Sequence, residues 1–237
     1  MNAPRQLQFY ATPPQPCAYL PGQESISLLA DPVVTDRALY NRLARLGFRR
    51  SGSHVYRPAC ADCNACMPVR IPVAEFQSRR RDRRCLERNL DLQTQLVEAR
   101  FSAETYALYC AYLEARHPGG GMDKPTPEQF SQFLIGTWSD TWFLQLRSNR
   151  QLLAVAVIDQ LDDGLSAVYT FYDPLQTGRS LGHYSILRQI QATRTMGLPY
   201  LYLGYWIEAS RKMAYKGDYR PLEVFRGEHW ERLPYSP

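Results

Sequence analysis

The sequence predicts an α/β fold in which a mixed sheet is flanked by helices. The main observation is a β-branched and aromatic run at residues 167–172, followed by a glycine-containing turn, a helical pattern and a second apolar run at 200–203. Strand, turn, helix and strand in this order form a βαβ unit, which contains two parallel strands. The second observation is that upstream runs at 142–146 and 152–158 are separated by short polar turns, which is typical of antiparallel strands.

Three helices are expected to precede the βαβ unit. The first begins at Thr35 or Asp36, both residue types that cap helix N-termini, and ends at Gly47. The second follows Ser102, and the third is opened by a capping box that starts at Thr126. Helices, meandering strands, a helix and a final strand are the elements of an α/β domain.

The distribution of charge divides the chain near residue 100. Residues 1–100 hold 15 arginines, no lysine and 9 acidic residues, whereas residues 101–237 hold 13 lysines and arginines and 14 acidic residues. Arginine binds phosphate bidentately and stacks on bases, so a basic first part indicates a phosphate-bearing partner. A GC-rich genome would also raise the arginine count. We predict two domains, a basic, cysteine-containing one at 1–98 and an α/β domain at 99–237.

The composition is that of a globular protein, with 45% hydrophobic residues. No segment approaches the length of a transmembrane helix, and the N-terminal residues lack the apolar region of a secretory signal. We therefore expect no membrane partner and a cytoplasmic location, where the 6 cysteines are reduced.

A cluster of cysteines is a candidate metal site. Cys60, Cys63 and Cys66 follow one another at C-x-x-C-x-x-C spacing, and Cys17 lies upstream. Four thiolates can hold structural zinc or an iron–sulfur cluster. The same residues could instead be small side chains in a tight loop without a metal, so both interpretations stay open.

Five arginines crowd into seven positions, from residue 78 to residue 84. They are Arg79, Arg80, Arg81, Arg83 and Arg84. A run of this kind is usually a solvated helix face. It is also a candidate contact for nucleic-acid phosphates, which would position the nucleic acid without reading its sequence.

The strand–turn–helix segment resembles the pyrophosphate loop of GNAT-type N-acetyltransferases. That loop reads R/Q-x-x-G-x-G/A, and Arg179 and Gly182 take its first two defined positions, whereas Tyr184 replaces the last small residue. The resemblance implies a GNAT-like mixed sheet flanked by helices, with the smaller cysteine-containing N-terminal domain packed on it. A phenol ring at position 184 is expected to obstruct the backbone's approach to a coenzyme A pyrophosphate.

A second resemblance covers most of the chain. Its motifs are Arg49-Arg50-Ser51-Gly52 and Tyr56-x-Pro58 in the first half, and Tyr172-Asp-Pro, Ser180-Leu-Gly-x-Tyr184 and Lys212-Met-x-Tyr215-Lys216-Gly-x-Tyr219-Arg220-Pro221 in the second. Together they resemble the aminoacyl-tRNA–protein transferases of the arginyltransferase family. The compact length resembles the bacterial branch of that family, which transfers leucine to proteins beginning with Asp or Glu.

This resemblance implies an aminoacyltransferase whose partners are leucyl-tRNA and proteins with N-terminal Asp or Glu, which leucine marks for degradation in the N-degron pathway. An N-terminal amine, with a pKa of about 7.7–8.0, is partly neutral at physiological pH and can attack an activated ester. Positioning and an oxyanion donor could supply most of the acceleration, so no cofactor is required for the chemistry. The cysteine cluster of the eukaryotic members is incomplete here, since Cys17 is not followed by its usual paired cysteine.

The catalytic candidates lie where the two parallel strands end, the usual ligand crevice of an open α/β sheet. They are Tyr172, Asp173 and Tyr205. Asp173 is the candidate to hold or deprotonate the incoming amine. It could instead only start the turn before Pro174.

Two further groups complete the predicted site. The adenosine end of the tRNA is assigned to Arg179, Gly182 and Tyr184, and its phosphates to the five arginines at 79–84. The acceptor carboxylate is assigned to Arg49, Arg50, Lys212, Lys216 and Arg220. His183 could relay a proton, or could serve helix capping or packing.

Three alternatives compete with leucyl transfer. One is transfer of arginine from arginyl-tRNA, because residue chemistry does not identify the donor side chain. Another is a coenzyme A acyltransferase, against which Tyr184 argues. The third is a nucleic-acid-binding module built on the cysteine cluster, which would leave the motif at residues 212–221 without a role.

Overall fold

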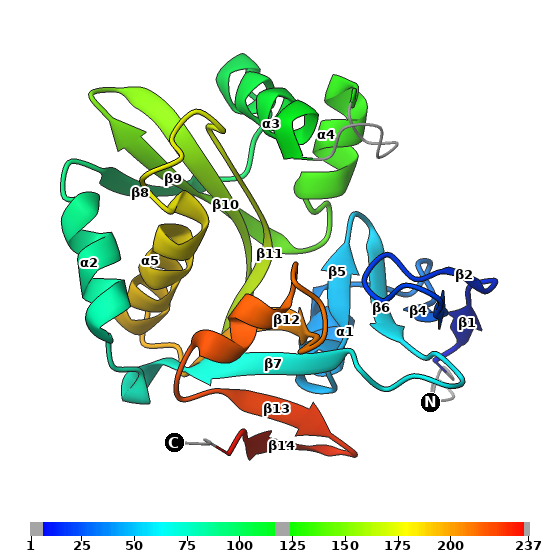
Figure 1. Cartoon of the computed structure of the whole chain (residues 1–237). Helices are drawn as coiled ribbons and strands as arrows, with labels where there is room; N and C mark the ends of the chain where they lie inside the picture. The colour runs from blue at the N-terminus through cyan, green and yellow to red at the C-terminus, as the bar shows by residue number, and fades with distance from the viewer. Residues whose placement is uncertain (1–6, 117–123, 235–237) are drawn as a thin grey trace.

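The computed structural model describes residues 7–116 and 124–234 (Figure 1). Its largest element is an eight-stranded mixed sheet. The strand order is β14 (His229–Arg232), β13 (Glu223–Arg226), β7 (Met67–Pro72), β12 (Tyr200–Trp206), β11 (Gly164–Tyr172), β10 (Gln151–Leu161), β9 (Asp140–Ser148) and β8 (Gln93–Glu98).

Within this sheet β11 and β12 form the parallel pair that the βαβ pattern predicts. They pair only from Gly164 to Ser166 and from Tyr200 to Tyr202. Beyond these residues β11 continues to Tyr172 beside β10, and β12 continues beside β7. The two parallel strands therefore separate in the middle of the sheet.

Helices cover both faces of the sheet, as predicted (Figure 1). On one face α5 (Leu181–Thr195) and α2 (Arg80–Arg88) bury Leu187, Ile190 and Cys85 in the largest apolar cluster. On the other face α3 (Ala103–Arg116) and α4 (Pro127–Leu134) bury Tyr109 and Phe130. None of the described helices is long and apolar enough to cross a membrane.

A smaller sheet is formed by the N-terminal part of the chain. Its order is β1 (Phe9–Ala11), β4 (Ser27–Ala30), β6 (His54–Pro58) and β5 (Arg49–Ser51). Helix α1 (Arg37–Arg45) packs on it, and the short pair β2 (Gln15–Pro16) and β3 (Glu24–Ser25) lies beside it. Two 3₁₀ turns, η1 (Val73–Glu75) and η2 (Ala214–Asp218), complete the elements.

The predicted boundary between residues 98 and 99 is not a boundary between sheets. Strands β7 and β8 both precede it in the chain, yet both belong to the large sheet, where β7 pairs with β12 and β8 with β9. Because β7 and β8 form hydrogen bonds with strands that come later in the chain, they belong to the large sheet and not to the N-terminal part. The smaller sheet itself ends at Pro58.

The predicted helix starts are confirmed. The Asp36 side chain accepts a hydrogen bond from the Leu39 N–H at 2.7 Å. Ser102 accepts from the Thr105 N–H at 3.2 Å, and Thr126 forms a reciprocal capping box. Each cap satisfies a backbone N–H that has no partner within its own helix.

Candidate active site

The gap between the separating strands β11 and β12 is occupied by the guanidinium of Arg49, which extends from β5. Its Nη1 donates to the Tyr202 carbonyl at 3.2 Å, and its Nη2 donates to the Ala167 carbonyl. Gly204 makes this approach feasible, because its φ is +81° and a Cβ there would lie 3.1 Å from Arg49 Nε. The smaller sheet thus places one positive charge between the two strands of the larger sheet.

A second buried cation, Lys216, lies beside Arg49. It is carried by η2, and its Nζ donates to the Tyr205 carbonyl at 2.9 Å. Burial and then the charge of Arg49 lower the pKa of Lys216 to about 7, with a smaller opposing effect from Cys66. Gly217 fixes the turn, because any Cβ there would lie 2.8 Å from the Trp206 ring.

The two cations share an unusual property. Arg49 is 8% exposed and Lys216 9% exposed, and among the described residues both donate to backbone carbonyls and neither pairs with a carboxylate. A buried positive charge without a counter-ion is costly, and an anion that enters would offset that cost. The pair is therefore a candidate anion site.

Aromatic side chains adjoin the two cations. Tyr172, at the end of β11, packs edge to face on Tyr112 with ring centroids 5.0 Å apart, and the Arg116 guanidinium lies 5.6 Å from its ring. Tyr215 is 46% exposed and lies near both Arg49 and Tyr172. These rings offer apolar surface beside the anion site.

Comparison with known proteins identifies the family. A family model described as "Arginine-tRNA-protein transferase, N terminus" matches residues 15–84, and one described as "Arginine-tRNA-protein transferase, C terminus" matches residues 104–226. The chain belongs to the arginine-tRNA-protein transferase family. It is accordingly an enzyme, an aminoacyltransferase, as the second resemblance implied. The two matched ranges are separated by residues 85–103, which include the predicted domain boundary.

Similar curated proteins span nearly the whole chain. A protein of Marinobacter nauticus named aspartate/glutamate leucyltransferase is 47% identical over 98% of this chain and 99% of its own. One of Nitrosococcus oceani with the same name is 50% identical over 96% of each chain. Among solved structures, L-PGS from Bacillus licheniformis matches 71% of this chain and 49% of its own at 14% identity, with a TM-score of 0.46, a likeness too distant to carry an argument.

Arg50 was predicted to bind the acceptor carboxylate, and this prediction is wrong. Its Nε and Nη2 donate to Asp159 at 2.6 and 3.0 Å, and further bonds reach the carbonyls of Gly52 and Leu134. Both charged side chains of this pair are 0% exposed. Arg50 therefore has an internal carboxylate and is not available to an acceptor.

Tyr205 and Asp173 also serve the fold. The Tyr205 hydroxyl lies 3.0 Å from the carbonyls of Gly47 and Tyr56, and the residue is 6% exposed, which corrects its assignment as catalytic. The two oxygens of Asp173 accept from the Leu175 N–H and the Gln176 side chain at 2.9 and 3.3 Å. This is the turn-forming interpretation of Asp173.

The predicted adenosine-end residues are arranged differently from the expectation. Tyr184 is 3% exposed and packs in the core, so it neither faces a ligand nor obstructs the start of α5. Arg179 is bound to Asp91 through two hydrogen bonds of 2.8 and 2.9 Å. A Cβ at Gly182 would meet only the Tyr172 ring, at 3.5 Å.

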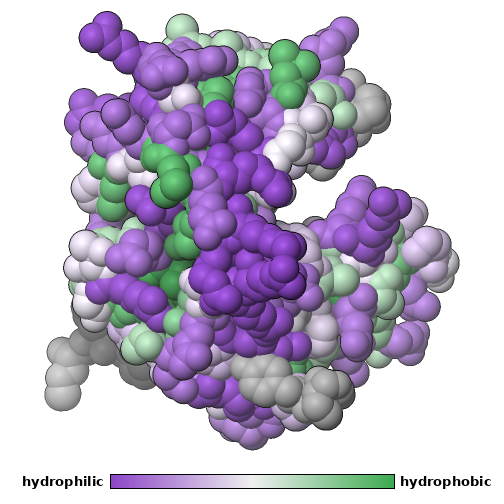
Figure 2. Space-filling model, turned by 60° about the vertical axis from the view of Figure 1, so that its left-hand side comes forward, coloured by the Kyte–Doolittle hydropathy of each residue, from purple (hydrophilic) through white to green (hydrophobic). Residues whose placement is uncertain are grey.

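The arginine run forms part of α2 and is exposed. All five predicted phosphate-binding residues lie on the surface: Arg79, Arg80, Arg81, Arg83 and Arg84. Figure 2 brings this side of the molecule forward and shows hydrophilic residues over the centre of the face, with a hollow beside them. Arg81 pairs with Asp218 at 2.7 Å, whereas Arg80 and Arg84 have no partner among the described residues.

The last two predicted carboxylate-binding residues differ in their exposure. Lys212 is exposed, and Arg220 is half-buried with its Nη1 at 3.5 Å from the Tyr219 carbonyl. Of the five residues assigned to the acceptor, the structure brings Arg49 and Lys216 together.

The cysteines lie beside this site. Cys60, Cys63 and Cys66 line a cavity of about 370 Å³. Burial, and then the charges of Cys60 and Cys17, raise the pKa of Cys66 to about 11. Within the described residues no three His, Cys, Asp or Glu side chains are arranged to hold a metal ion. Bound zinc or an iron–sulfur cluster stays a prediction, which metal analysis of protein purified with and without air would test.

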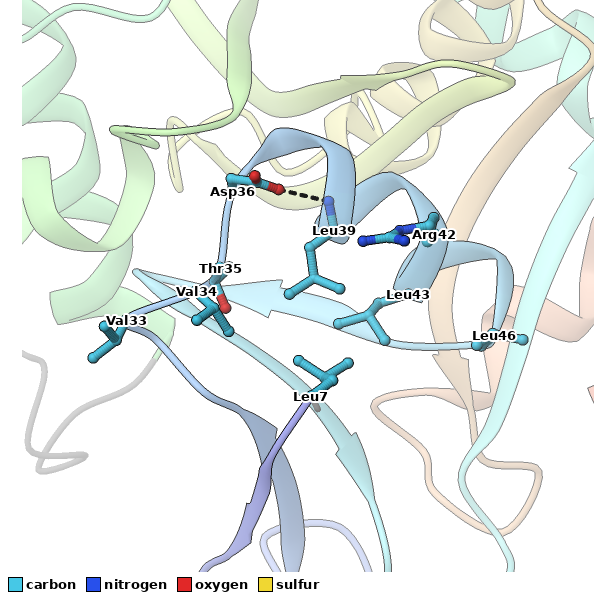
Figure 3. Close-up of a pocket in the computed structure, with 9 residues that line it drawn as sticks. All are labelled: Leu7, Val33, Val34, Thr35, Asp36, Leu39, Arg42, Leu43 and Leu46. Atoms are coloured by element: carbon cyan, nitrogen blue, oxygen red, sulfur yellow. Dashed lines mark hydrogen bonds between the residues drawn. The ribbon is translucent and has the colours of Figure 1, made fainter. Parts of the chain in front are cut away.

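A larger cavity of about 610 Å³ lies between α1 and the chain that precedes it (Figure 3). The leucines of α1 point into it from beyond the Asp36 cap, and its lining is mostly aliphatic: Leu7, Val33, Val34, Leu39, Leu43 and Leu46. None of the predicted site residues contributes to it.

His183 belongs to a polar cluster whose other members, Asp82 and Tyr219, were not predicted to accompany it. His183 Nε2 lies 2.8 Å from Asp82 Oδ1, and His183 Nδ1 lies 2.7 Å from the Tyr219 hydroxyl. The available signal was Asp82 itself, the one acidic residue inside the arginine run.

Proposed function

We propose that this transferase moves leucine from leucyl-tRNA to the N-terminal amine of proteins that begin with Asp or Glu. The observation that carries the proposal is the pair of buried cations, Arg49 and Lys216, without a carboxylate partner among the described residues. A side-chain carboxylate on the acceptor would supply the missing charge. The similarity to aspartate/glutamate leucyltransferases over nearly the whole chain supports the same donor and acceptors.

The reaction exchanges an ester for an amide. The neutral amine of the acceptor attacks the carbonyl carbon of the leucyl ester, a C–N bond forms, and the bond from that carbon to the ribose oxygen breaks. The proton lost by the amine ends on the departing ribose hydroxyl. Because the ester is activated and the amine is partly neutral near pH 7, holding the two together supplies much of the rate.

Arg49 and Lys216 are proposed to bind the acceptor's side-chain carboxylate, and Tyr172 and Tyr215 to flank the peptide. The exposed arginines of α2 are proposed to contact tRNA phosphates, which would align the ester with the amine. We also propose that the large sheet is GNAT-like, with its parallel strands separating at the reaction centre. Support for this comes from the short pairing of β11 and β12.

Coenzyme A is a less suitable donor than aminoacyl-tRNA, and the reason is Arg49. In a GNAT-like sheet the space between the separating strands is where the related proteins hold coenzyme A. Here the Arg49 guanidinium bonds to a carbonyl on each strand, Ala167 on β11 and Tyr202 on β12. Tyr184 does not obstruct coenzyme A as predicted, because its ring is buried in the core.

The proposed product is a protein with an added N-terminal leucine, which marks it for degradation. Aminoacyl-tRNA is a cytoplasmic substrate, so the proposal places the reaction in the cytoplasm.

The test is transfer of radiolabel to short peptides that begin with Asp, Glu, Arg or Ala. Labelled leucyl-tRNA, arginyl-tRNA and acetyl-CoA are offered in separate reactions. Leucine should appear on the Asp and Glu peptides and not on the Arg or Ala peptides. Transfer from arginyl-tRNA alone would assign arginine as the donor, and transfer from acetyl-CoA alone would overturn the proposal.

A further inference from the structure

The Asp82 network, formed by Asp82, His183 and Tyr219, connects three elements of the fold. Asp82 lies in the first turn of α2, His183 in the first turn of α5, and Tyr219 directly after η2. Asp82 is 2% exposed and Tyr219 is also 2% exposed. The His183 side chain between them is 22% exposed. Because the groups on either side of it are buried, their donors and acceptors have to be paired within the protein.

The bonds determine which nitrogen of His183 carries the proton. Asp82 accepts at both oxygens, since its Oδ2 takes the Arg79 N–H at 2.8 Å and its Oδ1 lies 2.8 Å from His183 Nε2. Nε2 must therefore donate, and Nδ1 of the neutral ring accepts from the Tyr219 hydroxyl at 2.7 Å. Burial lowers the pKa of His183, which favours this neutral form.

The charged groups around His183 come from two elements. From α2, Asp82 opposes the fall in the pKa of His183 and Arg81 adds to it, and from η2, Asp218 opposes it. Arg81 also pairs with Asp218 at 2.7 Å and lies 5.8 Å above the Tyr219 ring. The arginine helix and η2 are thus joined twice, by an exposed ion pair and by the Asp82 network.

Tyr219 holds the end of the turn that carries Lys216. Its N–H lies 3.5 Å from the Lys216 carbonyl, and the start of the turn is held by a bond of 3.1 Å from the Trp206 indole to the Ala214 carbonyl. Loss of the Tyr219 anchor would release one end of η2 and leave the other in place.

We propose that His183 is a positioning residue, which through Asp82 and Tyr219 holds η2 and its Lys216 in register with the arginine helix α2. The inference rests on the proposed function, because it gives Lys216 the acceptor carboxylate as its ligand. It predicts that damage to the network weakens use of the acceptor and spares binding of the tRNA, since the exposed face of α2 is unchanged.

The kinetic test compares Tyr219→Phe and His183→Gln with the wild type. Tyr219→Phe removes one oxygen and keeps the buried ring, so it serves as the informative variant where His183→Gln does not fold. Each should raise the KM for an Asp-peptide by about tenfold while the Kd for leucyl-tRNA, measured by filter binding, stays within twofold. His229→Gln, at a histidine with a side chain 73% exposed, is the matched control and should match the wild type. An unchanged KM in Tyr219→Phe, or an equal loss of tRNA affinity, would overturn the inference.

A second measurement does not depend on activity. Long-range ¹H–¹⁵N spectra at pH 7.5 should show His183 as the Nε2–H tautomer, assigned by its absence in His183→Gln. Tyr219→Phe should shift the Nδ1 resonance. An Nδ1–H tautomer would contradict the inferred hydrogen bonds of His183, even if the enzyme transfers leucine. Conversely, a wild type without transferase activity but with the Nε2–H tautomer would overturn the proposed function and leave the network intact.

Discussion

Arg49 and Arg50 are neighbours on one strand, and both are buried, yet their surroundings differ in one respect. The strand's alternation sends the two side chains to opposite faces. Arg50 meets Asp159, which also accepts from Tyr40 and Thr141 at 3.1 and 2.7 Å. Arg49 meets Lys216 and two strand carbonyls.

The difference separates a cation whose charge is balanced inside the protein from one that, in the proposed function, binds the acceptor carboxylate. The charge of Arg50 is balanced inside the protein, so it stabilises the junction of β5 with β10. The charges of Arg49 and Lys216 repel each other, which is one cause of the lowered pKa of Lys216. In the proposed function, the side-chain carboxylate of the acceptor offsets this repulsion.

The largest expected effect is on the free energy of unfolding when the Arg50–Asp159 pair is broken. Asp159→Asn leaves Arg50 buried without its counter-charge and should cost about 3–5 kcal/mol of unfolding free energy. Urea unfolding measures it. Glu98→Gln removes the carboxylate of the exposed pair with Arg100 and is the control, with a change below about 0.5 kcal/mol. Equal losses in the two variants would contradict the structural role of Arg50.

The next effect concerns Arg49, which has no carboxylate partner among the described residues. Arg49→Met should reduce kcat/KM for an Asp-peptide by about 100-fold, or roughly 2.7 kcal/mol of transition-state stabilisation. The loss follows from removal of a charged group bound to the acceptor carboxylate. Steady-state kinetics with saturating leucyl-tRNA measure it. The unfolding free energy of Arg49→Met should fall by less than that of Asp159→Asn. A larger fall in Arg49→Met would show that Arg49 has a structural role.

The stability of Lys216→Met relative to the wild type should depend on pH. The folded pKa of Lys216, about 7, lies below the unfolded value of 10.5, so the wild type gains stability as pH rises between these values. Below pH 7 the variant should therefore be the more stable, by about 1–3 kcal/mol, and its advantage should shrink toward pH 10.5. Thermal unfolding across this range measures the difference, and an advantage that grows with pH would contradict the assignment.

The smallest effect is expected from the exposed arginines. Arg80→Gln combined with Arg84→Gln should weaken tRNA binding and reduce the slope of log K against log salt by about 1–2, since each lost phosphate contact contributes roughly 0.7–0.9. Filter binding between low and moderate salt measures the slope. Stability should not change, because neither residue has a partner among the described residues. An unchanged slope would remove α2 from the tRNA contact.

Local chemistry made several elements predictable. The caps at Asp36, Ser102 and Thr126 were identified because a cap is a contact within four residues. The parallel pair β11 and β12 was identified because the βαβ pattern is local as well. Strand β7 was not predicted, since its prolines at 68 and 72 argue against a central strand. In the structure these prolines pair with β12, and β13 pairs with the residues between them.

The sequence by itself determined the family, the mixed sheet flanked by helices, and the presence of cationic residues at 49, 50 and 216. Only the tertiary structure decided which of those cations has an internal carboxylate and which does not. The reason is physical, because the partner of Arg50 lies 109 residues away and the neighbour of Arg49 lies on a turn near the end of the chain. Charge balance in a buried site depends on which distant side chains the fold brings together, and short-range sequence patterns do not predict it.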